Sequence, residues 1–130
     1  KYNMKKKLLI LAGLFTFVLL GFSLRYFFPH YSTDKGKIVY IGLGERKIAE
    51  EADTETFKEL DNVFGIDKNY VYYMGKALKN IDRNTFEPTD WFIPVPNDPV
   101  WGIGCQTSYI TEFKDKNGVY KTEDLRNRKD

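Results

Sequence analysis

The chain has 130 residues, of which 42% are hydrophobic and 16% aromatic, and its formal net charge is +2. This length leaves room for one small domain once an apolar N-terminal segment is set apart. The single cysteine excludes an internal disulfide, and the single histidine excludes most zinc sites, which need several His or Cys ligands.

An uncharged apolar run occupies residues 8–24, directly after Lys5, Lys6 and Lys7. Its length of about 17 residues is at the short end of what crosses a bilayer core, and the lysines favour a cytoplasmic N-terminus. We therefore predict a single-pass signal anchor over residues 1–28 in the cytoplasmic membrane, with the rest of the chain outside the cytoplasm. The alternative is cleavage of this segment as a signal peptide, which would release a secreted or periplasmic protein.

Charge is unevenly distributed along the chain. Residues 34–130 hold 15 basic and 18 acidic side chains, so the part beyond the apolar segment is mildly acidic although the whole chain is basic. An acidic domain is poorly suited to the phosphates of nucleic acid or to anionic lipid headgroups. The sequence therefore argues against nucleic acid as a partner.

Residues 67–73, with the sequence DKNYVYY, combine a turn signal with aromatic and β-branched side chains. Weaker copies at residues 34–40 and 115–120 also place an Asp-Lys turn before a Val-Tyr pair. Around the central copy we predict a hairpin with an entering strand at 63–66, a return strand at 70–74 and a short third strand. Both faces of the return strand carry apolar side chains, so neither face is expected to be freely solvated.

A second motif, Asp-x-x-Thr-Phe, follows the first copy at residues 53–57 and the second copy at residues 82–86. Asp is a good N-cap and the Phe can enter the core one turn later, so both segments are predicted to form short helical turns. Ile48 and Ala52 extend the first of these into a possible longer helix. The predicted fold is mainly β with short helices, an α+β class of degenerate β-hairpin repeats behind an N-terminal transmembrane helix.

The predicted domain organisation follows from these segments. Residues 1–28 are the membrane segment, 29–33 a linker, 34–125 the repeat domain and 126–130 a charged tail. Within the domain, residues 87–105 interrupt the repeats with four prolines. Because proline removes hydrogen-bond donors from a β-ladder, this segment is predicted to be an ordered loop or an irregular edge.

The central motif also indicates a family. Residues 67–73, followed by Gly-Lys at 75–76 and by the segment 82–86, resemble the DKNYY family of bacterial envelope proteins, which is named for this turn-strand motif. The resemblance is close over residues 53–86 and looser in the flanking copies. It implies an extracytoplasmic bacterial setting and a repeat architecture, and it implies no active site because the family has no established function.

The sequence favours no catalytic centre. His30 lies in the predicted linker and Cys105 in an apolar stretch, so these two residues are not expected to form a Cys-His nucleophile. Carboxylate pairs at Asp53 with Glu55 and at residues 50–51 are compatible with acid-base hydrolysis of a glycan. A helix start and a solvated face explain these carboxylates better.

An aspartate begins each copy of the repeat, at Asp34, Asp67 and Asp115. Calcium needs six or more oxygen ligands, and the lysine that follows each aspartate would place a cation in the site. Turn formation explains the three aspartates better. We therefore expect no metal ion and no cofactor.

The candidate binding surface consists of Trp91, Phe92 and Trp101, which lie in the proline-rich segment. Aromatic faces suit both protein anchors and pyranose rings, and core packing is the alternative explanation for them. We predict a non-enzymatic, membrane-anchored module that binds an envelope protein or cell-wall glycan. The alternatives are an envelope hydrolase with paired carboxylates and a structural or immunity-type small protein.

Overall fold

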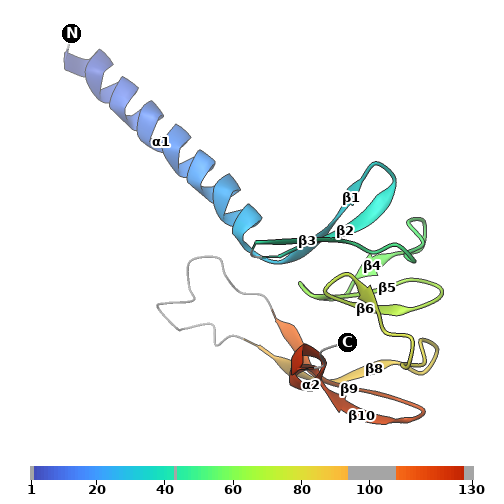
Figure 1. Ribbon diagram of the computed structural model, residues 1–130. Coiled ribbons are helices and arrows are strands. Elements are labelled where there is room, and N and C mark those ends of the chain that lie inside the picture. Colours follow the sequence, from blue (N-terminus) through green and yellow to red (C-terminus); the bar gives the residue numbers. More distant parts are fainter. Residues whose placement is uncertain (1, 43, 94–107, 128–130) are drawn as a thin grey trace.

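The computed structural model describes residues 2–42, 44–93 and 108–127 and, within the first helix, the side chains of residues 3–20. A long helix leads into a domain of short antiparallel strands that ends in a short helix (Figure 1). In chain order the elements are α1 (Tyr2–Phe27), β1 (His30–Asp34), β2 (Lys37–Gly42), β3 (Glu45–Ile48), β4 (Lys58–Glu59), β5 (Phe64–Ile66), β6 (Val71–Tyr73), β7 (Lys76–Ala77), β8 (Glu87–Phe92), β9 (Tyr109–Asp115), β10 (Gly118–Lys121) and α2 (Thr122–Asn127).

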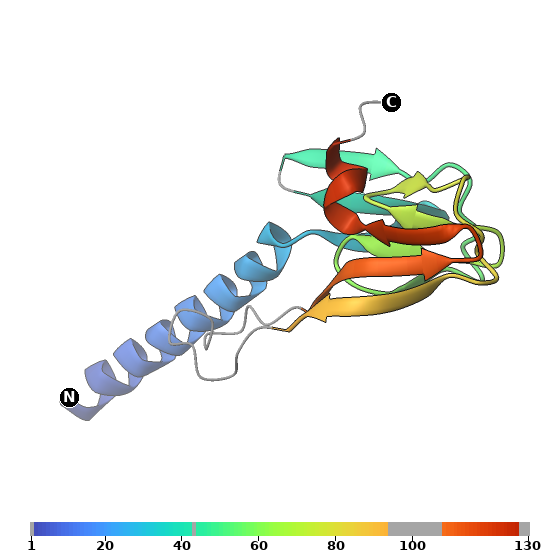
Figure 2. The same cartoon turned by 90° about the horizontal axis from the view of Figure 1, so that it is seen from below.

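Helix α1 projects away from the strands (Figures 1 and 2). Its large apolar side chains are exposed, with Leu9 73% and Phe17 76% accessible. The segment that was predicted to cross a membrane is therefore helical. Within the described residues, however, no helix combines the length and the apolar character that a membrane crossing requires. The transmembrane part of the prediction is thus not supported.

The strands form three small antiparallel sheets. The first sheet has the order β1-β2-β3, the central sheet β4-β5-β6-β7 and the last sheet β10-β9-β8. Figure 1 shows them following one another through the domain in sequence order. The predicted mainly β fold with few helices is confirmed.

Strand β6 lies in the middle of this stack and buries both of its faces. Val71 and Tyr73 join the core cluster that the central sheet forms with Ile110 and Phe113 of the last sheet. Tyr72 joins the opposite cluster, whose members from the first sheet include Tyr40. Successive side chains of a strand point to opposite faces, so three consecutive apolar residues serve two cores. The predicted hairpin and its two apolar faces are confirmed.

Two hairpins are closed by the same type of two-residue turn. Lys35 and Gly36 have φ values of 49° and 75°, and Met74 and Gly75 have φ values of 48° and 80°. Each pair connects two antiparallel strands in register, β1 with β2 and β6 with β7. Positive φ at both central residues gives a turn whose twist matches that of the flanking strands. The first copy therefore corresponds structurally to the β6–β7 hairpin, and its alignment with residues 67–73 was wrong.

Three local predictions change in the structure. Ile48 ends β3, where it pairs with Val39, so the longer helix through this residue was wrong. The shorter prediction is confirmed, because Phe57 N–H donates to the carbonyl of Asp53 at 3.0 Å and closes a single helical turn. Residues 30–33, which were predicted to be a linker, belong to β1. Helix α2 starts before the predicted charged tail and extends into it.

The predicted irregular edge is present in the described part of the proline-rich segment. Strand β8 is the edge strand of the last sheet, and its pairing with β9 shifts register on both sides of Asp90. Pro88 lies at this edge, where a missing donor is tolerated. The remainder of the segment, with Trp101 and Cys105, lies outside the described residues.

The two glycines at positive φ provide a matched test of the stack. A Cβ at Gly75 would lie 2.9 Å from the Cβ of Tyr40 in the first sheet, whereas a Cβ at Gly36 would meet no atom within 4 Å. We expect Gly36→Ala to lower the free energy of unfolding by about 1–2 kcal/mol through backbone strain alone. Gly75→Ala should lower it by about 1–3 kcal/mol more because the first sheet must shift. Urea unfolding measures both, and equal losses would contradict the close approach of the two sheets.

Candidate functional site

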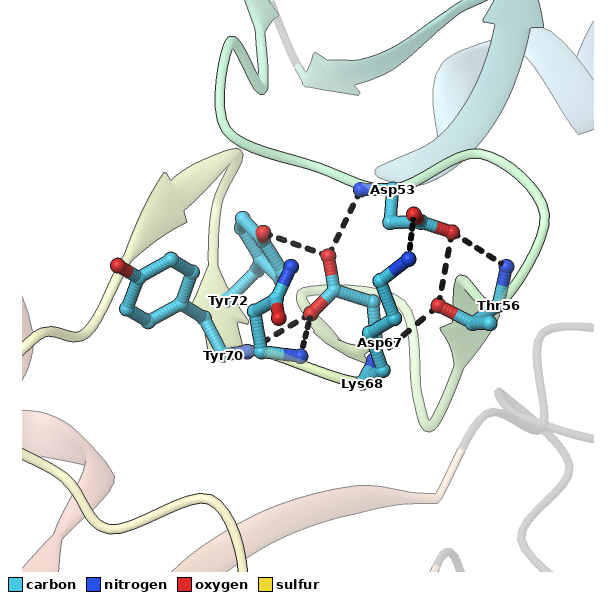
Figure 3. A network of polar contacts seen from close by, with 7 residues as sticks. Asp53, Thr56, Asp67, Lys68, Tyr70 and Tyr72 are labelled. Carbon is cyan, nitrogen blue, oxygen red and sulfur yellow. Dashed lines mark hydrogen bonds and ion pairs between the residues drawn. The ribbon is translucent and has the colours of Figure 1, made fainter.

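The carboxylate of Asp67 accepts hydrogen bonds from three parts of the chain: its own turn, strand β6 and the segment at residues 53–57 (Figure 3). Its Oδ1 accepts the N–H groups of Asn69 and Tyr70, each at 2.7 Å. Its Oδ2 accepts the N–H of Asp53 and the hydroxyl of Tyr72, each at 2.8 Å. Asp67 is only 1% exposed, so this buried charge is compensated by four hydrogen-bond donors.

The Asp-x-x-Thr-Phe segment holds the same turn from the other side. Asp53 Oδ1 accepts both the N–H and the hydroxyl of Thr56 at 3.0 Å. Thr56 Oγ1 in turn accepts the N–H of Lys68 at 3.1 Å, and Lys68 Nζ lies 2.6 Å from Asp53 Oδ2. Figure 3 shows these contacts closing a ring between the two segments, which we call the carboxylate clamp.

The clamp occurs a second time, in the last sheet. Asp115 Oδ2 accepts the N–H of Asp82 at 2.8 Å, and its Oδ1 accepts the N–H of Asn117 at 2.8 Å. Thr85 Oγ1 donates to Asp82 at 2.7 Å and accepts the N–H of Lys116 at 2.9 Å. The repeat is therefore a repeat of hydrogen-bond geometry as well as of sequence.

The partner segments differ from those that the sequence analysis paired. Each Asp-x-x-Thr-Phe segment clamps the Asp-Lys-Asn turn that follows it, so residues 53–57 hold the turn at Asp67 and residues 82–86 the turn at Asp115. The first copy has a different arrangement, in which the half-exposed Asp34 forms an ion pair with Arg46. The order of the two motifs along the chain could have predicted this pairing, because each Asp-x-x-Thr-Phe segment precedes the turn that it holds.

A further aspartate, which the sequence analysis did not identify, connects two sheets. Asp61 is 8% exposed, and its Oδ1 accepts the N–H groups of Val63 and Phe64 at the start of β5. Its Oδ2 accepts the N–H of Ile110 in β9 at 2.8 Å. This carboxylate joins the central sheet to the last sheet.

The environment of the clamp keeps its carboxylates ionised. Burial alone would raise the pKa of Asp67, but the hydrogen bonds from Asp53, Tyr70, Tyr72 and Asn69 outweigh it and lower that pKa. The pKa of Asp53 is lowered chiefly by its hydrogen bond from Lys68. A carboxylate with a lowered pKa is a poor general acid, and the hydrogen bonds of the clamp hold its two segments together.

The carboxylates considered for hydrolysis are mostly engaged elsewhere. Asp53 belongs to the clamp, while Glu50 lies 3.1 Å from Lys37 and Glu51 lies 2.6 Å from Lys79. Glu50 and Glu51 therefore lie beside different lysines. Glu55 is exposed.

The expectation that His30 and Cys105 form no Cys-His pair stays a prediction. His30 Nδ1 lies 2.8 Å from the carbonyl oxygen of Phe28, next to the end of α1, and Cys105 lies outside the described residues. In the part of the chain that the structure describes, no group of three or more His, Cys, Asp or Glu side chains is arranged to hold a metal ion.

Two of the three residues predicted as a binding surface are consecutive at the end of β8, so their side chains point to opposite faces of the sheet edge. Trp91 is 37% exposed and Phe92 41%, beside Ile93 at 71%. Phe92 stacks across the strand pair on Tyr109 of β9, with ring centroids 4.9 Å apart and planes 23° apart. We call Trp91, Phe92, Ile93 and Tyr109 the aromatic edge. Trp101 lies outside the described residues, and Tyr109 was missed because its pairing with Phe92 depends on strand register.

A cleft of about 670 Å³ is lined by Tyr109 of the aromatic edge and by residues of α2. Tyr109 lines it, together with Phe28 beyond the end of α1 and Tyr73 from the central sheet. Of the described residues that line it, three are acidic and two are basic. One residue of the aromatic edge, Tyr109, therefore lines a cleft whose charged residues are slightly acidic in balance.

Stacked hairpin sheets joined by recurring carboxylate clamps define a small β-repeat protein. A sequence model of the DKNYY family matches residues 6–124, so the chain belongs to the DKNYY family. The match extends the resemblance from the central motif to nearly the whole chain, including most of α1. A search of curated proteins and a search of solved structures found no match.

The three repeat aspartates form a graded series for mutagenesis. Asp67→Ala should lower the free energy of unfolding by at least about 3 kcal/mol, because it leaves four donors without their acceptor. Asp115→Ala should cost about 1–3 kcal/mol at its less buried clamp. Asp34→Ala removes a solvent-screened ion pair and should cost at most about 1 kcal/mol. Urea unfolding at neutral pH measures the order, and equal losses would contradict the assignment of the clamp.

The lowered pKa of Asp67 also predicts a pH dependence. A carboxyl group whose folded pKa lies below its unfolded value of about 3.9 stabilises the fold above that value, and this stability is lost as pH falls through the folded pKa. Asp67→Asn removes the titrating group. The difference in unfolding free energy between the wild type and Asp67→Asn should therefore shrink as pH falls from about 6 to about 3. A difference that is independent of pH would refute an ionised clamp.

Proposed function

We propose that this protein is a non-enzymatic binding module of the bacterial envelope, held at the membrane by α1 and presenting its repeat domain outside the cytoplasm. The observation that carries the binding role is the aromatic edge. Trp91 and Phe92 remain about two-fifths exposed in a domain whose Phe64, Tyr72 and Phe113 are fully buried. Burying such exposed apolar surface against a partner would remove it from water and thereby stabilise the complex.

The chemistry of the edge favours a protein partner. Ile93, at 71% exposure, is an aliphatic side chain that suits a protein contact better than a sugar ring. The hydroxyl of Thr111 donates to Asp90 at 3.0 Å, so polar groups near the edge are already paired with each other. The register shifts and Pro88 make β8 a poor template for an added strand, so recognition would rest on side chains. An envelope protein is therefore favoured over a cell-wall glycan.

The proposed location rests on α1 and on the family. Residues 8–20 of the helix are exposed and uncharged, and Lys5, Lys6 and Lys7 precede them. An apolar surface of this kind is unfavourable in water and is stabilised by contact with lipid or with another apolar surface. In a membrane-inserted helix these lysines would favour an N-terminus on the cytoplasmic side, which supports the proposal that the repeat domain is on the outer side.

Crosslinking on intact cells tests the surface and the location together. A membrane-impermeant crosslinker should capture a specific protein with the wild type, and Trp91→Ala/Phe92→Ala should reduce that capture at least about tenfold, since such aromatic anchors contribute about 2 kcal/mol each. Val119→Ala is the matched control, because Val119 is 64% exposed on the opposite edge strand of the same sheet. Circular dichroism should be unchanged in both variants.

Each contrary outcome has a definite meaning. Capture that survives the double substitution would remove the aromatic edge as the binding surface. Capture only after cell lysis would place the domain in the cytoplasm. Binding to purified cell wall that depends on Trp91 and Phe92, with no protein captured, would replace the protein partner by a glycan.

A further inference from the structure

A second cleft, of about 1,020 Å³, opens beside the β6–β7 hairpin. Its walls come from β3, β7, β10 and α2, which are far apart in the sequence. None of the four residues of the aromatic edge lines it. The volume is at the upper end of the roughly 300–1,000 Å³ that is typical of small-molecule sites.

The rim of this cleft is basic. Of the described residues that line it, four are basic and one is acidic: Lys47, Lys76, Lys79 and Arg126 against Glu51. Residues 34–130 are acidic as a whole, and the first cleft has more acidic than basic lining residues. The fold thus gathers positive charge at one place on an otherwise acidic domain.

Existing ion pairs at the rim are weak competitors for a ligand. Lys47 lies 3.0 Å from Glu45, and Lys79 lies 2.6 Å from Glu51. The side chains of these lysines are 45% and 63% exposed, and surface ion pairs of this kind contribute little net stability. Exchange of such a pair for a ligand anion is therefore inexpensive.

The floor of the cleft is apolar and belongs to the core. Tyr73 and Ile81 are each 7% exposed and are members of the cluster between the central and last sheets. Partly buried side chains that pack against this cluster complete the floor: Met74, Leu78, Tyr120 and Leu125. A ligand in the cleft would contact a firm apolar surface and a cationic rim at the same time.

We propose that this cleft binds a single amphiphilic anion, with its phosphate or carboxylate at the basic rim and its apolar portion on the core floor. Arg126 presents a planar fork of donors that matches either anion, and the lysines add point charges around it. The basic rim alone would bind any small anion, and the apolar floor alone would bind any small apolar molecule, so selection of an amphiphilic anion requires both. The site contains none of the four residues of the aromatic edge, although it shares Tyr73, Met74 and Arg126 with the first cleft, and it stands if the proposed binding function fails.

Three small molecules test separately whether the cleft binds the anionic group and whether it binds the apolar portion. The full-length chain, held in nanodiscs of neutral phosphatidylcholine, is titrated with hexyl phosphate, inorganic phosphate and hexanol by isothermal calorimetry. Hexyl phosphate should bind about 1:1 and at least about tenfold more tightly than inorganic phosphate, because part of its chain leaves water. Hexanol should not bind measurably. Equal affinity for the two phosphates would overturn the apolar half of the proposal, and absence of binding would overturn it entirely.

Variants locate the site. Lys76→Gln/Arg126→Gln should weaken hexyl phosphate binding at least about tenfold through loss of charge-assisted hydrogen bonds. Lys58→Gln is the control, because Lys58 is exposed on β4 and does not line the cleft. The affinity of the wild type should also fall as ionic strength rises. Equal affinity in all three proteins, with unchanged circular dichroism, would place the anion elsewhere.

The source of the anion is distinguished by the lipid of the nanodisc. Replacing part of the phosphatidylcholine with phosphatidylglycerol supplies an anionic headgroup on the same membrane. Reduced apparent affinity for hexyl phosphate that Lys76→Gln/Arg126→Gln abolishes would show that bilayer lipid reaches the cleft. Unchanged affinity would assign the cleft to a free amphiphile.

Discussion

The hydrogen bonds to the buried carboxylate of Asp67 are the constraint on which the rest of the domain depends. A charge that is 1% exposed is tolerated only because four donors converge on it, and those donors come from its own turn, from β6 and from the preceding segment. Strands as short as these fix few backbone hydrogen bonds. The clamps add side-chain hydrogen bonds that hold the turns at Asp67 and Asp115 against a second segment.

Packing follows from the clamp through strand β6. Tyr72 donates its hydroxyl to Asp67 while its ring packs between the first and central sheets, so one side chain links the polar and apolar parts of the structure. Val71 and Tyr73 pack on the other side, against the last sheet. The close approach of Gly75 to Tyr40 then brings the first sheet against the hairpin. The three residues of β6 therefore contribute to both hydrophobic clusters of the domain.

The residues that make the family recognisable are therefore occupied by the fold. The aspartate, threonine and lysine side chains of the two motifs form hydrogen bonds and ion pairs with one another. The features suited to partners lie elsewhere. The aromatic edge is at the end of β8, and the basic cleft is lined partly by α2.

The sequence by itself determined the central hairpin, its two apolar faces, the short turns and the irregular proline-bearing edge, because these depend on side-chain alternation and on turn residues a few positions apart. Only the tertiary structure decided which Asp-x-x-Thr-Phe segment clamps which turn, that the first copy is a different hairpin, and that Tyr109 completes the aromatic edge. It also gathered Lys47, Lys76 and Arg126 at one cleft although the domain is acidic overall. These arrangements depend on strand register and sheet stacking, which join residues distant in sequence and leave no local pattern.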